Sequence, residues 1–168
     1  MSPTAETATA ETATAPRPPA PRPPAPAPAA ALRTQAVVTA DTALHLVALA
    51  LAEGARRGIP VSATVVDPGM GLIACAKADE ANPHGLETSR RKACTAASKR
   101  RPTGWMGGQL ALTLPLASGN ALTDVRGGLP IRYDGLLGGG LGVAGGTEDD
   151  DAEIAAAVLA AAGADRTE

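Results

Sequence analysis

Residues 61–103 constrain the fold most, because they encode two short strands joined by a tight turn and followed by a helix. The run VSATVV at 61–66 is short and rich in β-branched residues, which is typical of a strand. The following DPGMG combines a proline with two glycines and predicts a tight turn at 67–71. Residues 71–77, GLIACAK, then return as the partner strand, with Cys75 a small core or sheet-surface residue.

A basic helix follows this hairpin. Asn82 predicts an N-cap with Pro83 in the first helical position, and Pro102 predicts a helix end near Arg100. The helix carries cations at its middle and at its end, namely Arg90, Arg91, Lys92, Lys99, Arg100 and Arg101. Solvated charge is the default interpretation, and an anion-binding patch is the alternative. Nucleic-acid binding is not expected, because no aromatic residues are interleaved with the cations for base stacking.

A second helix is predicted before the hairpin, over residues 40–57. Thr39 is a suitable N-cap, and Gly58 with Pro60 predicts the end. Apolar residues recur at spacings of three and four and predict the buried stripe, namely Leu44, Val47, Leu51 and Ala55.

The rest of the chain reads as further strands and a last helix. Residues 104–120 predict a short helix or a covering loop anchored by Trp105, and strands are expected at 121–127, 128–133 and 136–143. Asp134–Gly135 predicts a hairpin turn, and the glycines of 138–142 predict close packing against another backbone. Thr147 predicts the final N-cap, with a buried line made by Ile154, Val158 and Ala161. The carboxylates of 148–151 suit the positive end of a solvated helix better than a metal site.

The first 31 residues differ from the rest in composition. They consist of Thr/Ala/Glu and Pro/Arg/Ala repeats without large apolar side chains, which predicts a disordered tail at 1–31 and one domain at 32–168. The sequence contains no continuous apolar run of membrane-spanning or signal-peptide length, and only two cysteines, so we expect a cytoplasmic protein without a membrane partner. With no phenylalanine, the core must be built from small aliphatic residues, which favours a homo-oligomer.

Three blocks of sequence resemble the GlcG/HbpS-like family of haem-binding and glycolate-operon-associated proteins. They are residues 60–69, residues 92–103 with KACTA and RPT, and residues 127–146 with GGLPI, DG and GVAGG. The resemblance extends from Thr39 to Ala162. It implies an α/β (α+β) fold in which an antiparallel sheet of about five strands is covered by helices, together with assembly into oligomers.

Two functions remain open. The resemblance favours a small-molecule-binding protein for haem or another anionic planar ligand, and it makes haem the candidate cofactor. Arg90, Arg91 and Cys94 are then the ligand-binding residues and His84 the metal ligand. The alternative is an enzyme without a separate cofactor, acting by acid–base chemistry on a specialised-metabolism intermediate. Its candidate catalytic residues are Asp67, Asp79, His84 and Glu87, because the turn at 67–71 and the loop at 77–87 are expected to meet beside the basic helix.

Overall fold

A computed structural model describes residues 32–166 of the chain. The chain divides into a unit at residues 1–34 and a compact unit at residues 35–168. The predicted disorder of residues 1–31 lies outside the described residues.

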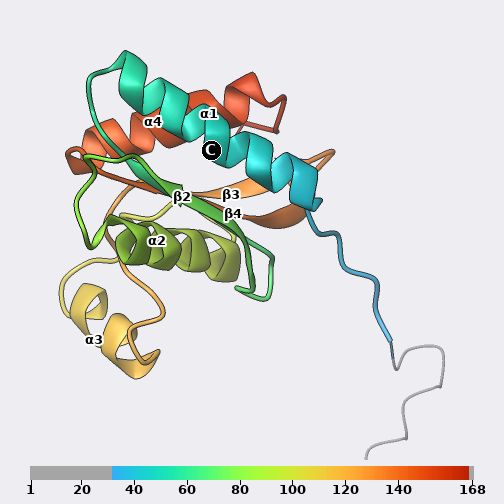
Figure 1. Cartoon of the computed structure of the whole chain (residues 1–168). Coiled ribbons are helices and arrows are strands. Elements are labelled where there is room, and N and C mark those ends of the chain that lie inside the picture. The colour runs from blue at the N-terminus through green and yellow to red at the C-terminus, as the bar shows by residue number, and fades with distance from the viewer. Residues whose placement is uncertain (1–31, 167–168) are drawn as a thin grey trace, which may run out of the picture. The chain divides into compact units, whose positions relative to one another are not determined.

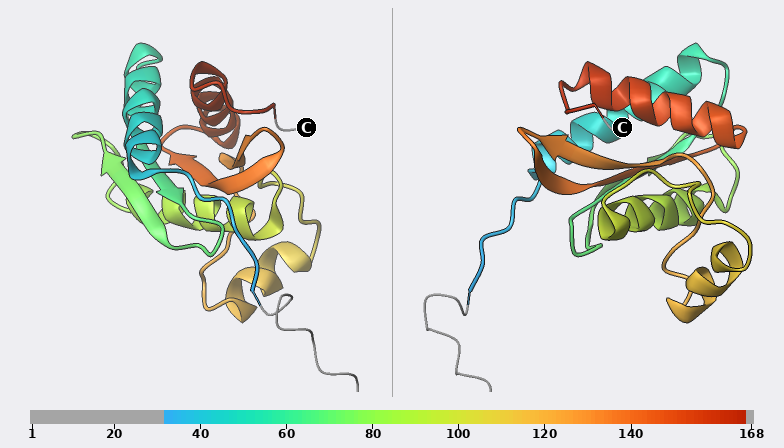
Figure 2. Two further views of the ribbon diagram at one scale, coloured as in Figure 1. Left: turned by 90° about the vertical axis from the view of Figure 1, so that its right-hand side faces the viewer. Right: turned by 180° about the vertical axis from the view of Figure 1, so that it is seen from behind.

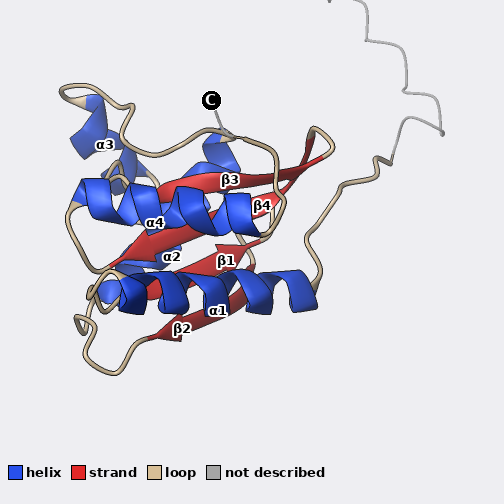
Figure 3. Ribbon diagram, turned by 90° about the horizontal axis from the view of Figure 1, so that it is seen from above, coloured by secondary structure: helices blue, strands red, loops and turns tan. Residues whose placement is uncertain are grey.

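The second unit contains one antiparallel sheet of four strands in the order β2-β1-β4-β3 (Figure 3). The strands are β1 (Ser62–Val66), β2 (Leu72–Lys77), β3 (Gly128–Tyr133) and β4 (Leu136–Ala144). The fold class is therefore confirmed, with four strands among residues 32–166 where about five were expected. The prediction of a strand at 121–127 is wrong, because this segment is tied to a helix. The Thr123 N–H donates to Thr95 Oγ1 at 2.8 Å.

Both predicted hairpins are present. Asp134 and Gly135 join β3 to β4 with φ angles of 52° and 77°, the left-handed geometry that a two-residue turn matching the sheet twist requires. Asp67 organises the other turn, since its Oδ1 accepts the N–H groups of Gly69 and Gly71 at 2.6 and 2.9 Å.

Helices cover both faces of the sheet (Figures 1 and 2). On one face lie α1 (Ala40–Arg56) and α4 (Glu148–Ala161), and on the other lies α2 (Gly85–Lys99), with α3 (Leu110–Ala117) beyond it. Strand β1 serves both layers because its side chains alternate. Ala63 and Val65 join the core beneath α1 and α4, whereas Val66 packs with Ala93 and Cys94 of α2.

The predicted helix at 40–57 is present as α1, but its predicted stripe is displaced. The Thr39 Oγ1 caps the helix by accepting the Thr42 N–H at 3.2 Å, as expected. Leu44, however, is 59% exposed, and the buried line of α1 is Ala43, Leu46, Val47, Ala50 and Gly54. The smallest residues face the sheet because space is short there, and a Cβ at Gly54 would lie 2.8 Å from the Val61 side chain.

Helix α2 begins later than predicted and ends where expected. Asn82 is not its N-cap, since the Asn82 carbonyl accepts the Gly85 N–H at 2.9 Å in a turn that precedes the helix. Gly85 starts α2 because it packs directly on Ser62, where a Cβ would meet the Ser62 Oγ at 2.5 Å. The helix ends at Lys99, and Arg100 adopts a left-handed conformation with φ of 59°.

The glycines of β4 allow α2 to approach the sheet closely, as predicted. A Cβ at Gly140 would overlap the Ala93 carbonyl oxygen, and one at Gly142 would overlap that of Ser89. Helix α2 is thereby fixed over the sheet by backbone contact, with a hydrogen bond of 2.7 Å between the Thr64 and Ser89 hydroxyls beneath it.

The remaining helices follow the predictions with one correction. The segment 104–120 contains the short helix α3, and the Trp105 ring lies 4.6 Å from the Arg101 guanidinium carbon. Thr147 caps α4 in a reciprocal pair with Asp150. Ile154 and Val158 are buried, but Ala161 is exposed, and the buried line is completed by Ala155 and Leu159.

Candidate functional site

The exposed face of α2 carries three charged side chains that lie together. Glu87 Oε2 lies 2.8 Å from Arg90 Nε, and Glu87 Oε1 lies 2.7 Å from Arg91 Nε. Hydrogen bonds from Arg90 and then Arg91 lower the pKa of Glu87 from 4.5 to about 2. Glu87 is therefore a weak base at neutral pH, and its carboxylate is shared by the two guanidiniums.

Arg90 also connects this charged face to the β1–β2 turn. Its Nη1 lies 3.8 Å from the buried Cys94 Sγ, which in turn lies 4.0 Å from the Met70 carbonyl oxygen. Burial raises the pKa of the Cys94 thiol, so the sulfur acts as an apolar contact between helix and turn. Met70 and Leu72 are 39% and 58% exposed, and these two side chains form a short apolar strip at the turn that Cys94 of α2 contacts.

The predicted meeting of the turn at 67–71 with the loop at 77–87 is wrong. Strands β1 and β2 pair in antiparallel register from Ser62 opposite Lys77 to Val66 opposite Leu72, so the two connections lie at opposite ends of the hairpin. The length of β1 separates them by roughly 15 Å. Asp67 therefore lies at one end, beside Cys94, and Asp79 lies at the other, where the chain enters α2.

His84 lies at the start of α2 and is exposed. Spacings of three and seven residues place it on the same face of the helix as Glu87 and Arg91. His84, Glu87 and Arg91 therefore form one surface with Arg90 at its side. Of the acid–base candidates, this surface includes His84 and Glu87 only.

A buried ion pair between Lys92 and Asp151 was not predicted from the sequence. The expectation of solvated charge is wrong for both residues, because their side chains are 1% and 4% exposed and Lys92 Nζ lies 2.6 Å from Asp151 Oδ2. Lys92 also donates to the Val143 carbonyl oxygen at 2.9 Å, and Asp151 accepts the Gly146 N–H at 3.0 Å. Burial lowers the pKa of Lys92, while Asp151 opposes that shift. Two features of the sequence could have indicated this pair. Lys92 is followed by small residues that are buried, and Asp151 lies four residues after the N-cap Thr147.

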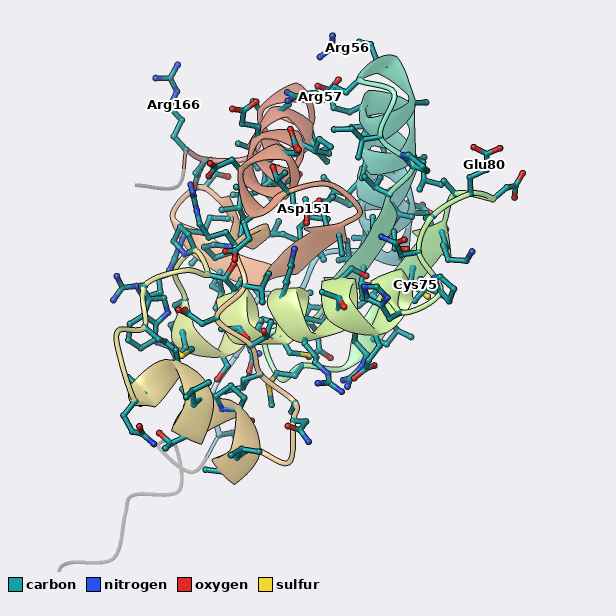
Figure 4. The ribbon with its side chains drawn as sticks, turned by 90° about the vertical axis from the view of Figure 1, so that its left-hand side faces the viewer. Arg56, Arg57, Cys75, Glu80, Asp151 and Arg166 are labelled. Atoms are coloured by element: carbon teal, nitrogen blue, oxygen red, sulfur yellow. The ribbon has the colours of Figure 1, made fainter. Side chains whose placement is uncertain are left out.

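Cys75 and Glu80 lie on one side of the unit in Figure 4, between α1 and the start of α2. Cys75 is exposed on the edge strand β2 and is a sheet-surface residue.

Among residues 32–166, no three His, Cys, Asp or Glu side chains gather as a metal-binding group. No helix in the same range combines the length and the apolar character needed to cross a membrane.

Fold and side chains together define a small α+β protein in which one antiparallel sheet carries a helix with an exposed charged face. The chain belongs to the HbpS-like family, since the family model described as "Haem degrading protein HbpS-like" matches residues 38–160. Protein GlcG of Escherichia coli strain K12 is 33% identical over 118 residues, which covers 67% of this chain and 84% of GlcG.

Solved structures share the fold. Klebsiella pneumoniae protein ORFY aligns with a TM-score of 0.73 and 25% identity, over 81% of this chain and 97% of that one. A double mutant of Streptomyces reticuli HbpS aligns with a TM-score of 0.70 and 29% identity, over 85% and 98% of the two chains. PduOC, solved as a haem complex, has a TM-score of 0.71 at 23% identity over 79% and 99%, a likeness of fold alone.

Proposed function

We propose that this protein binds a small, planar, anionic ligand on the exposed face of α2, with haem as the first candidate. The observation that carries the proposal is the pair Arg90 and Arg91, held by one exposed carboxylate next to the apolar strip of Met70 and Leu72. A flat apolar ring suits such a strip, and its carboxylates suit the guanidiniums. Haem comes first because the description of the family names it.

The residues of α2 fit this ligand in type and spacing. His84 supplies an exposed imidazole suitable for coordinating iron, which is the chemistry that haem would bring to the site. Arg91 lies seven residues further along the same face, about 10 Å along the helix axis. The Glu87 side chain is 48% exposed, so exchanging its ion pairs for ligand carboxylates costs little, on the order of 1 kcal/mol or less.

A haem titration followed by absorbance tests this proposal. We expect a dissociation constant below about 10 μM for the parent protein, corresponding to about −7 kcal/mol. His84→Ala removes the proposed iron ligand and Arg91→Ala removes one carboxylate contact. We expect each to weaken binding about tenfold. His45→Ala, on the exposed face of α1, is the matched control and leaves affinity unchanged. Equal affinity in all four proteins contradicts the proposed location, and binding weaker than 10 μM in the parent contradicts haem as the ligand.

We also propose that the protein is a homo-oligomer that uses α3. This helix contains no charged residue and no buried residue, and its leucines 110, 112 and 116 are 42%, 66% and 71% exposed. An uncharged apolar helix can pack against its own copy without like-charge repulsion, and that contact would remove the leucines from water.

A further inference from the structure

A hollow lies on the opposite side of the β1–β2 hairpin from the α2 face. It has a volume of about 380 Å³ and lies between the C-terminal end of α1 and the loop that follows β2. Leu51, Ala55, Ile59 and Pro60 give it an apolar wall, and Asp79 and Glu80 contribute the only charged side chains that line it. None of the α2 residues of the proposed ligand site lines this hollow.

The charges around the hollow favour a cation. Asp79 and Glu80 are exposed and form no ion pair within the described part of the chain. Helix α1 also ends at the hollow, where Gly58 lines it, so the negative end of the helix dipole has the same sign as the carboxylates.

The two arginines at the end of α1 are paired with carboxylates outside the hollow. Arg56 pairs with Glu53 at 2.6 Å, and Arg57 pairs with Glu53 and with Glu153 of α4 at 2.7 and 2.8 Å. Lys77 does not line the hollow and donates to the Ala81 carbonyl oxygen at 3.3 Å. Figure 4 shows Glu80 on the loop beside α1, with its carboxylate free of these arginines.

We propose that this hollow binds an organic ammonium ion with a short aliphatic body. The ammonium group would lie between Asp79, Glu80 and the end of α1, and the aliphatic body would cover Leu51, Ala55 and Ile59. A bare divalent metal ion fits less well, because two side-chain carboxylates supply too few ligands and the apolar wall supplies none. The site is distinct from the α2 face in both position and ligand charge.

The test is a titration of ¹⁵N-labelled full-length protein with n-hexylammonium chloride, monitored by amide chemical shifts. We expect saturable shifts confined to residues 51–60 and 78–80, with a dissociation constant of about 10 mM or tighter, as suits a small ligand at an open site. Heptanoate and n-hexanol carry the same hexyl chain without the positive charge, and we expect both to bind at least fivefold more weakly.

Two variants separate the charge from the shape of the hollow. Asp79→Asn with Glu80→Gln removes the carboxylates, and we expect hexylammonium to bind at least fivefold more weakly. Ala55→Leu fills the hollow from an exposed helix position, and we expect it to abolish the shifts while the protein stays folded. The matched control, Asp41→Asn with Asp134→Asn, removes two exposed carboxylates elsewhere and keeps the parent affinity.

Three outcomes would overturn the proposal. They are equal binding of hexanol and hexylammonium, shifts located outside residues 51–60 and 78–80, and unchanged affinity in the Asp79/Glu80 variant. The haem titration tests a different surface. A negative result with hexylammonium therefore leaves the proposal for α2 unaffected, and a negative haem titration leaves the proposal for the hollow unaffected.

Discussion

Lys92 and Asp151 form a buried ion pair that joins helices on opposite faces of the sheet. The Lys92 Nζ of α2 lies 2.6 Å from the Asp151 Oδ2 of α4, and the same ammonium donates to the Val143 carbonyl oxygen of β4. A Cβ at Gly127 would meet the Asp151 side chain at 2.7 Å and the Lys92 Nζ at 3.1 Å, so only glycine leaves room for the pair. This pair therefore fixes α2, the helix that carries the proposed ligand face, against the far layer.

Removing one partner of this pair should strongly destabilise the fold. Lys92→Met leaves the Asp151 carboxylate buried without its cation, and we expect a loss of about 3–5 kcal/mol in the free energy of unfolding by urea. The double replacement Lys92→Met with Asp151→Leu removes both charges and should recover most of that loss. Arg91→Met, which breaks an exposed pair, is the control and should cost about 1 kcal/mol or less. A single variant as stable as the control would show that the pair contributes nothing.

The glycine contact between β4 and α2 should tolerate no side chain. Gly142→Ala places a methyl group against the Ser89 carbonyl oxygen, and we expect it to lower the free energy of unfolding by about 3 kcal/mol. Gly107→Ala is the matched control, since nothing lies within 4 Å of its added Cβ and its φ is not positive. Equal melting temperatures for the two variants would argue against the close approach of α2.

The ion pairs of Glu87 should make a small pH-dependent contribution to stability. Its folded pKa of about 2 lies below the ordinary 4.5, so the contribution is complete above pH 4.5 and is lost as the pH falls from 4.5 towards 2. Because these side chains are exposed by more than a third, we expect parent and Glu87→Gln to differ by about 1 kcal/mol or less at pH 7. The difference should vanish near pH 2, and a difference that grows on acidification would contradict this.

The proposed oligomer should depend on α3. Leu112→Asp with Leu116→Asp places charges on its two most exposed leucines, and we expect light scattering at micromolar concentration to change from oligomer to monomer. Leu44→Asp, on the exposed side of α1, is the control and should keep the oligomer. A monomeric parent protein would refute self-association altogether.

The sequence predicted the local elements well where turn and cap chemistry is strong. Asp134–Gly135 and Thr147 lie where their preferences placed them, because each depends on its own backbone neighbours. The buried stripe of α1 was predicted only in part: Val47 is buried, but Leu44 is exposed, because space beneath the helix is short and favours small side chains such as Ala43. The local sequence pattern contains no information on the distance between α1 and the sheet.

The candidate site was predicted less completely, for a related reason. His84, Glu87 and Arg91 were predicted as candidates and belong to one short stretch of chain, whereas the separation of Asp67 from Asp79 follows from strand pairing, which sequence distance does not reveal. Lys92 and Asp151 are 59 residues apart, and their pairing depends on the packing of two helices against one sheet. The disordered tail at 1–31 and the cytoplasmic location stay predictions.

The most direct test of the account is where haem contacts the protein. Iron(III) haem broadens the amide resonances of nearby residues, so titrating it into ¹⁵N-labelled protein maps its position. We predict loss of signal at residues 70–72 and 84–91, with α1 and α4 unaffected. Broadening centred on α1 or α4, or no site-specific broadening with haem in excess, would contradict the proposed ligand face of α2.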